Sequence, residues 1–156
     1  MIKLFLIGNK CAKIPSWMKN AIDFNSRIVG GSIAESPIPW QVQVRGKYFC
    51  GGTILDEYTI LSAAHCEITS NSYILAGHIS AQSGPQAQRI RVKNVFRHPK
   101  FNYFAKRFDY SIVKLREPLI FNSNVKPACL PTENFVSGDV AVASGWGSTQ
   151  DSKLFF

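Results

Sequence analysis

The sequence predicts an all-β protein, an antiparallel barrel or sandwich, with a short tail at the N-terminus. Three observations predict it: short segments in which apolar and polar residues alternate, turn residues between those segments, and no sustained helical repeat. Many short strands at regular spacing are typical of antiparallel barrels and sandwiches. The 156 residues suffice for one domain, because a single core commonly takes roughly 100–200 residues.

The individual strands follow from the alternation. Trp40–Val44 alternates apolar and polar residues with a period of two, which is typical of a strand with one buried face. The same reasoning predicts six more strands, which are Tyr48–Leu55, Thr59–Ser62, Tyr73–Ala76, Gln88–Phe96, Tyr110–Leu115 and Val140–Ser144. Turn residues separate them, as at Arg45-Gly46, Ser83-Gly84-Pro85 and Ser137-Gly138-Asp139.

The N-terminal 27 residues differ from the rest of the chain. They are basic and show no alternating pattern, whereas short apolar runs begin at Ile28, so we expect a domain boundary between Arg27 and Ile28. Leu4–Gly8 resembles the start of a secretory signal, but it stops after five residues, and such a core normally needs 7–15. No segment approaches the ~20 apolar residues of a membrane span. We therefore expect a secreted protein with an incomplete signal segment and no membrane anchor.

The charge is strongly positive and locally concentrated. The formal net charge is +8, and residues 68–108 contain no Asp or Glu. Seven cations lie in that interval, namely Arg89, Arg91, Lys93, Arg97, Lys100, Lys106 and Arg107. Most such runs are merely solvated surface, but this one is a candidate anion-binding face. The aromatic and glycine pattern of an RNA-binding sheet is missing, so nucleic acid is not expected.

The four cysteines indicate disulfides rather than a metal site. Their spacings are long and contain no Cys-x-x-Cys pair, so neither a zinc site nor a redox motif is expected. In an oxidising compartment they would form two disulfides, for which three connectivities are possible.

The strongest motif is Leu61-Ser62-Ala63-Ala64-His65-Cys66. Cys50-Gly51-Gly52 precedes it and Asp109-Tyr110-Ser111 follows. With these segments the sequence resembles the chymotrypsin/trypsin family of serine proteases. Four further segments match the family in order, which are Ile28-Val29-Gly30-Gly31, Pro39-Trp40-Gln41-Val42, Ala128-Cys129-Leu130-Pro131 and Ser144-Gly145-Trp146-Gly147.

The resemblance implies a fold and a reaction. Residues 28–156 would form the six-stranded Greek-key barrel that is the first of the family's two barrels, after a signal remnant and propeptide at 1–27. His65 would be the general base that takes the proton of an attacking serine, and Asp109 the carboxylate that orients it. The substrate would be a protein or peptide, with no cofactor and no metal.

The resemblance also implies disulfides and an activation step. Cys50 would pair with Cys66 and hold the segment that presents His65. Cys11 would pair with Cys129 and tether the propeptide. A trypsin-like protease would cut between Arg27 and Ile28 to activate the zymogen.

The family's Gly-Asp-Ser-Gly-Gly segment does not occur in these 156 residues. Its serine is the nucleophile, and its backbone N–H groups build the oxyanion hole. The sequence therefore predicts the N-terminal half of a protease, truncated before the second barrel and inactive by itself. The alternative is a non-catalytic homologue that binds a polyanion or a partner protein through the basic face of Arg89, Arg91, Lys93 and Arg97.

Overall fold

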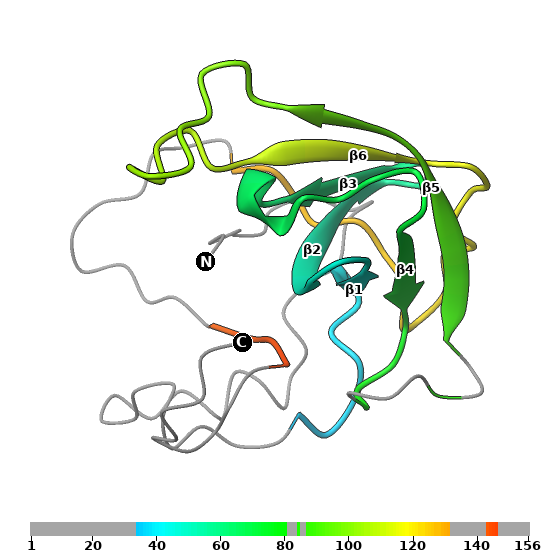
Figure 1. The fold of residues 1–156 in the computed structure, drawn as a ribbon. Helices are drawn as coiled ribbons and strands as arrows, with labels where there is room; N and C mark the ends of the chain where they lie inside the picture. The colour runs from blue at the N-terminus through cyan, green and yellow to red at the C-terminus, as the bar shows by residue number, and fades with distance from the viewer. Residues whose placement is uncertain (1–33, 81–83, 85–86, 132–142, 147–156) are drawn as a thin grey trace, which may run out of the picture.

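A computed structural model describes residues 34–80, 84, 87–131 and 143–146. Six strands form a closed antiparallel barrel with the neighbour order β1-β2-β3-β6-β5-β4 (Figure 1). The strands are β1 (Gln41–Arg45), β2 (Phe49–Asp56), β3 (Thr59–Ser62), β4 (Tyr73–Ala76), β5 (Gln88–Arg97) and β6 (Ser111–Leu115). The one helical segment in these residues is a short 3₁₀ turn, η1 (Ala64–Cys66). The predicted all-β class is confirmed. Because the sheet closes on itself, the fold is a barrel and not a sandwich.

Six of the predicted strands occur within about one residue of their expected bounds. The seventh, Val140–Ser144, lies mostly outside the described residues, and its described residues 143 and 144 are not in a strand. The tail at 1–27, including Arg27 and Cys11, and the junction residue Ile28 also lie outside the described residues.

The alternation predicts strands correctly because each strand turns every second side chain into the barrel. On β6 the buried residues are Ser111, Val113 and Leu115, and on β5 they include Ile90 and Val92. The inward side chains of the strands meet in one apolar cluster that Ile68, Leu119 and Val125 extend from outside the strands. Burial of such side chains from water is the main stabilising contribution to a fold of this kind.

Close packing explains why the Cys50-Gly51-Gly52 motif has glycine at position 52. A Cβ at Gly52 would lie 2.7 Å from Ile60 Cγ2 and 3.1 Å from Val42 Cγ2, both on buried side chains. A Cβ at Gly51 would meet no atom within 4 Å. The barrel therefore requires glycine at position 52, where β2 passes close to its neighbours, and not at position 51.

The strand order brings together two segments that are far apart in the sequence. β3 pairs with β6 rather than with β4, and the register places Ser62 opposite Ser111. The end of β3 therefore lies beside the start of β6, as the two neighbouring arrows show in Figure 1. The predicted site residues His65 and Asp109 follow and precede these two strand ends.

Candidate active site

His65 lies in the 3₁₀ turn η1, directly after β3. Ala63 is still extended, and Glu67 has a left-handed backbone with φ of 48°, so the helical turn ends after Cys66. The backbone N–H of Glu67 donates to the carbonyl of Ala64 at 3.3 Å, which closes the turn. The turn leaves the imidazole about half exposed, with 46% of the side chain accessible. His65 is therefore fixed through its backbone while its ring stays accessible.

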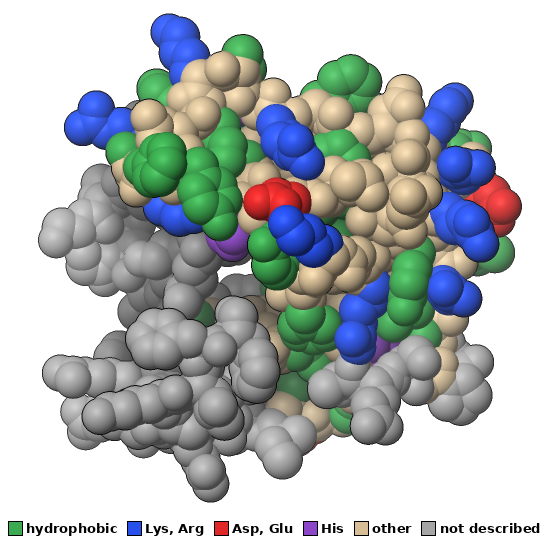
Figure 2. Space-filling model, in the orientation of Figure 1, with side chains coloured by type: hydrophobic (Ala, Val, Ile, Leu, Met, Phe, Trp, Pro, Cys, Tyr) green, Lys and Arg blue, Asp and Glu red, His purple; other side chains and the backbone are tan. Residues whose placement is uncertain are grey.

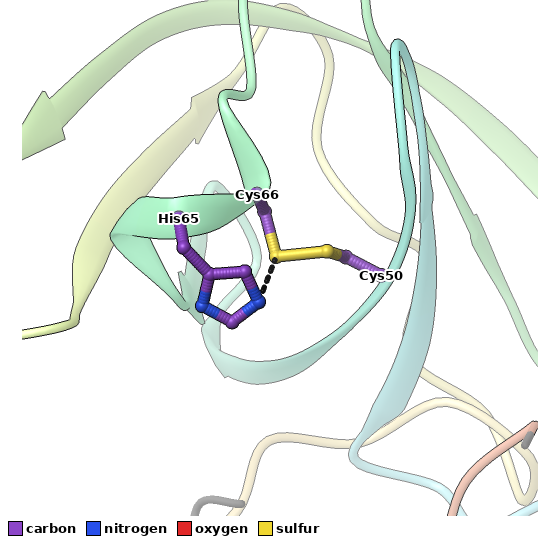
Figure 3. A group of neighbouring side chains, drawn as sticks. All are labelled: Cys50, His65 and Cys66. Atoms are coloured by element: carbon purple, nitrogen blue, oxygen red, sulfur yellow. Dashed lines mark hydrogen bonds between the residues drawn. A yellow bond between two sulfur atoms is a disulfide. The ribbon is translucent and has the colours of Figure 1, made fainter. Parts of the chain in front are cut away.

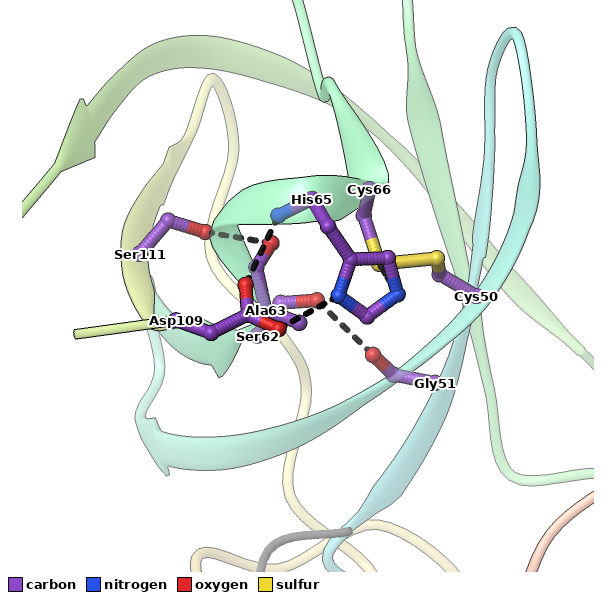
Figure 4. Close-up of a disulfide and its surroundings, with 8 residues drawn as sticks. All are labelled: Cys50, Gly51, Ser62, Ala63, His65, Cys66, Asp109 and Ser111. Atoms are coloured by element: carbon purple, nitrogen blue, oxygen red, sulfur yellow. Dashed lines mark hydrogen bonds and ion pairs between the residues drawn. A yellow bond between two sulfur atoms is a disulfide. The ribbon is translucent and has the colours of Figure 1, made fainter. Parts of the chain in front are cut away.

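Asp109 contacts His65 through both carboxylate oxygens (Figure 4). The backbone N–H of His65 donates to Oδ1 at 2.9 Å, and the ring Nδ1 lies 2.6 Å from Oδ2. Both oxygens have one partner each in the same residue, so the carboxylate fixes the turn and the ring together. The predicted pair is brought together by the fold.

Serine hydroxyls hold the two strand ends in place. Ser111 Oγ donates to the carbonyl of Ala63 at 3.1 Å, and Ser62 Oγ donates to the carbonyl of Gly51 at 2.8 Å (Figure 4). Both serines are buried. Their hydroxyls are committed to backbone carbonyls, so neither serine is available as a nucleophile. The positioning role of Ser111 was missed in the sequence, where the only signal is a small polar residue at the start of a strand.

The electrostatics of Asp109 result from opposing influences. Burial is the largest single influence and raises the pKa of Asp109, because it disfavours the charged carboxylate. The hydrogen bonds from the ring and the backbone of His65 lower it, as do the charge of His65 and the backbone of Ala64, and together these causes prevail. The pKa of Asp109 therefore lies below its usual value, and the group is an anion at neutral pH.

The arrangement determines which ring nitrogen is available. An ionised carboxylate only accepts hydrogen bonds, so the proton of a neutral His65 ring belongs on Nδ1, between the ring and Asp109 Oδ2. The other nitrogen, Nε2, then has a free lone pair. Within the described residues, Nε2 makes one weak contact, with Cys66 Sγ at 3.9 Å. A histidine in this state can take a proton at Nε2 from an incoming hydroxyl.

The predicted Cys50–Cys66 disulfide is present, with the two Cα atoms 6.2 Å apart. It joins β2 to the turn that bears His65 (Figure 3). Cys50, His65 and Cys66 also bring three possible metal-ligating atoms within 4.8 Å of one another. Metal-binding cysteines are thiolates, and both sulfurs here are used in the disulfide, so the cluster is a covalent brace and not a metal centre.

The remaining predicted residues lie apart from His65. Cys129 is buried and disulfide-bonded, while its predicted partner Cys11 lies outside the described residues, as do Arg27 and Ile28. The predicted anion-binding residues all lie on β5 and are exposed, and they are Arg89, Arg91, Lys93 and Arg97.

A hollow of about 350 Å³ begins at the turn that bears His65. It is lined by Lys47, Ala64, Glu67, Thr69, Arg97, Phe101 and Tyr103. Lys47 Nζ donates to Glu67 Oε2 at 2.7 Å on its wall, and this hydrogen bond lowers the pKa of Glu67 and raises that of Lys47. The pair is exposed, and such surface ion pairs contribute little stability. No motif in the sequence indicates this hollow, since its residues come from three separate segments.

Within the described ranges, no helix has the length and apolar character needed to cross a membrane.

Comparison with known proteins agrees with the site. The trypsin family model matches residues 28–155. Transmembrane protease serine 9 of Rattus norvegicus is 33% identical over 140 residues, which cover 84% of this chain and 13% of that protein. The chain thus spans a small part of the length of this curated relative. This chain belongs to the trypsin family of serine proteases.

Proposed function

We propose that this chain supplies the acid–base half of a serine-type endopeptidase. The observation that carries the proposal is the double contact of Asp109 with His65, at 2.9 Å to the backbone N–H and 2.6 Å to ring Nδ1. It orients the imidazole and leaves Nε2 free to act as a base. Membership of the trypsin family supports a protein or peptide as the substrate.

The proposed reaction is acyl transfer. His65 Nε2 takes the proton of a serine hydroxyl as its oxygen bonds to the carbonyl carbon of the scissile peptide. Asp109 stabilises the resulting imidazolium, which then gives its proton to the leaving amine as the C–N bond breaks. Water, activated by the same nitrogen, hydrolyses the acyl-enzyme. This chemistry uses no metal and no organic cofactor.

The nucleophile and the oxyanion donors have to come from residues other than those that form this barrel. No Gly-Asp-Ser-Gly-Gly segment occurs in the 156 residues, and Ser62 and Ser111 are committed to backbone carbonyls. We infer that the 156 residues alone hydrolyse no peptide bond, and that a serine-bearing second barrel completes the site.

We also propose the family's activation step for this chain. A trypsin-like protease would cut between the basic Arg27 and the aliphatic Ile28, and a Cys11–Cys129 bond would keep the propeptide attached. Disulfides persist in oxidising compartments, so the Cys50–Cys66 bond supports a secreted or extracellular site of action.

The test is to join the 156-residue chain to the serine-bearing half of a trypsin and to measure peptide-ester turnover. We expect turnover by the joined protein, a loss of about 10³-fold or more in its His65→Ala variant, and none by the 156 residues alone. A control is Tyr58→Ala, which removes an exposed ring in the turn between β2 and β3 and should keep full activity. Turnover by the 156 residues that depends on His65 would contradict the inferred need for a second barrel.

A further inference from the structure

The outer surface of β5 carries a row of cations. Arg89, Arg91 and Lys93 are exposed and alternate with Ile90 and Val92, which are buried in the barrel. Alternate side chains of a regular strand point to the same side at intervals of about 6.8 Å, and this holds for Arg89 and Arg91. Lys93 lies where the pairing of β5 with β6 shifts register between Val92 and Asn94, and its side chain is exposed there as well. We call Arg89, Arg91 and Lys93 the basic stripe.

Cations outnumber acids around the basic stripe. Neither β5 nor its neighbours β4 and β6 contain an Asp or Glu, and Arg116 continues the positive charge next to the stripe. Glu117, which follows Arg116, is the first acid beyond β6 in the sequence. In the described part of the chain the ion pairs are Lys47–Glu67 and His65–Asp109, so no stripe residue is paired with a carboxylate. Figure 2 shows Lys and Arg side chains gathered along the side of the molecule where β5 lies in Figure 1, with an acidic side chain among them.

Neighbouring groups hold two cations of this surface in place, Arg89 in the stripe and Arg116 beside it. The Arg89 guanidinium lies 4.0 Å from the ring centroid of Tyr73 on β4. The backbone N–H of Arg116 donates to the Arg91 carbonyl at 2.9 Å, and its side-chain Nε donates to the Val92 carbonyl at 3.2 Å. An arginine that is already ordered loses less side-chain entropy on binding an anion. Arg89 is therefore prearranged for a ligand, and Arg116 is held beside the stripe.

A hollow of about 500 Å³ lies at the Lys93 end of the stripe. It is lined by Ile68, Thr69 and Ser70, and by Lys93, Asn94, Val95, Phe96 and Arg97. Phe96 is 58% exposed and forms part of the wall of this hollow. The hollow thus combines two cations and two hydroxyls with an apolar wall, and it suits an apolar side chain that is flanked by acidic groups.

We propose that the basic stripe and this hollow form a docking surface for an extended acidic segment of a partner protein. An extended peptide presents alternate side chains at the same ~6.8 Å interval, so two of its carboxylates face Arg89 and Arg91, and a third approaches Lys93 at the register shift of β5. An apolar residue at the end of the segment enters the hollow beside Phe96. A sulfated polysaccharide matches the charge but has no apolar group for the hollow. The proposal does not depend on His65 acting as a base.

The test uses the 156-residue chain and a fluorescein-labelled peptide, Glu-Ser-Glu-Ser-Glu-Ser-Phe, with anisotropy measured at low and physiological salt. The triple variant Arg89→Gln, Arg91→Gln, Lys93→Gln should lose at least tenfold in affinity. The matched control is Lys100→Gln, Lys106→Gln, Arg107→Gln, which removes the same charge from the 100–107 loop and should change affinity by less than twofold. Circular dichroism checks that both variants keep the barrel, and Arg91→Gln alone provides a milder change with a partial loss.

Three further probes identify the occupant. A peptide of the same composition with its three glutamates adjacent should bind several-fold more weakly, and one with Ser in place of Phe should also lose affinity. Equal binding of the alternating and clustered peptides, or equal losses in the two triple variants, would show a response to net charge alone and overturn the proposal. Tight binding of a heparin hexasaccharide without binding of the peptide would overturn it as well.

Discussion

Asp109 accepts two hydrogen bonds from one residue, from the backbone N–H of His65 through Oδ1 and from its ring Nδ1 through Oδ2. The two residues are 44 positions apart in the sequence. The carboxylate therefore has a structural role and a chemical role at once, because it closes the β3–β6 end of the barrel and sets the ring for proton transfer. The two roles can be separated by substitution and by pH.

The structural role predicts a loss of stability in Asp109→Ala. The variant leaves the His65 N–H without its acceptor, and we expect the free energy of unfolding in urea to fall by about 1–2 kcal/mol at pH 7. Asp56→Ala is the matched control, because the exposed Asp56 accepts a backbone N–H from Tyr58 in a turn, and it should lose about 0.5 kcal/mol. Equal losses in the two variants would show that the Asp109 contact stabilises the fold no more than an ordinary turn hydrogen bond does.

The effect of Asp109 on stability should depend on pH. Its pKa is lower in the folded protein than the value near 3.9 of an unfolded chain, so ionisation favours the folded state. The contribution is present above about pH 4 and is lost as the pH falls through the lower, folded-state pKa. The difference in unfolding free energy between the wild type and Asp109→Asn should therefore shrink from pH 7 to pH 3, and a constant difference would contradict the lowered pKa.

The strands were predictable from the sequence, whereas their pairing was not. Inward residues such as Val113 and Leu115 recur with a period of two that is visible locally. The pairing of β3 with β6 depends on closure of the whole barrel, which no local pattern contains. The resemblance to the family implied a closed six-stranded barrel and the pairing of His65 with Asp109, but it did not predict which strands pair.

Features that depend on loop packing were not predictable. The hollow at the turn that bears His65 is lined by residues from separate loops and strands. The environment of His78 likewise depends on Trp146, whose ring centroid lies 5.5 Å from that of His78. The sequence places these two residues far apart and contains no pattern that relates them.

His78 should make the protein sensitive to mild acid. It is buried, and neither ring nitrogen has a hydrogen-bond partner of good geometry among the described residues. Burial is the main cause that lowers the pKa of His78, and the positive charge of Arg45 adds to it, while the backbone of Ser80 and Leu75 offsets part of the shift.

His78 binds a proton more readily in the unfolded chain than in the folded protein. The free energy of unfolding should therefore fall as the pH drops below about 6.5, by at most about 1.4 kcal/mol per pH unit. Urea unfolding at pH 7.5 and pH 5 should show a smaller loss in His78→Phe than in the wild type. Ile74→Val is the control, because it changes a buried side chain that does not titrate, and it should keep the wild-type loss. An unchanged loss in His78→Phe would rule out this residue as the cause.

The disulfide beside the site predicts a large effect on stability. Cys50 and Cys66 are 16 residues apart in the sequence, and closing a loop of this size stabilises a protein by about 3 kcal/mol. The double variant Cys50→Ala, Cys66→Ala should lose about that much in urea unfolding, and the backbone N–H of His65 should exchange faster with deuterated water. Unchanged exchange at His65 would mean that Asp109 alone fixes the turn.

Gly52 and Gly51 form a matched pair of variants. Gly52→Ala places a methyl group against Ile60 and Val42 in the barrel, and we expect a loss of about 1–3 kcal/mol from overpacking. Gly51→Ala places its methyl group in open space and should change the unfolding free energy by less than about 1 kcal/mol. A larger loss at position 51 than at position 52 would contradict the packing described for β2.

The central claim, that Asp109 sets His65 as a base with a free Nε2, can be measured by ¹⁵N NMR of histidine-labelled protein. At a pH where the ring is neutral, the wild type should carry its proton on Nδ1. In Asp109→Asn the amide can donate to Nδ1, so the proton should move to Nε2, as the loss of a carboxylate partner requires. A wild-type ring protonated on Nε2, or an Asp109→Asn ring with an unchanged tautomer, would contradict the account.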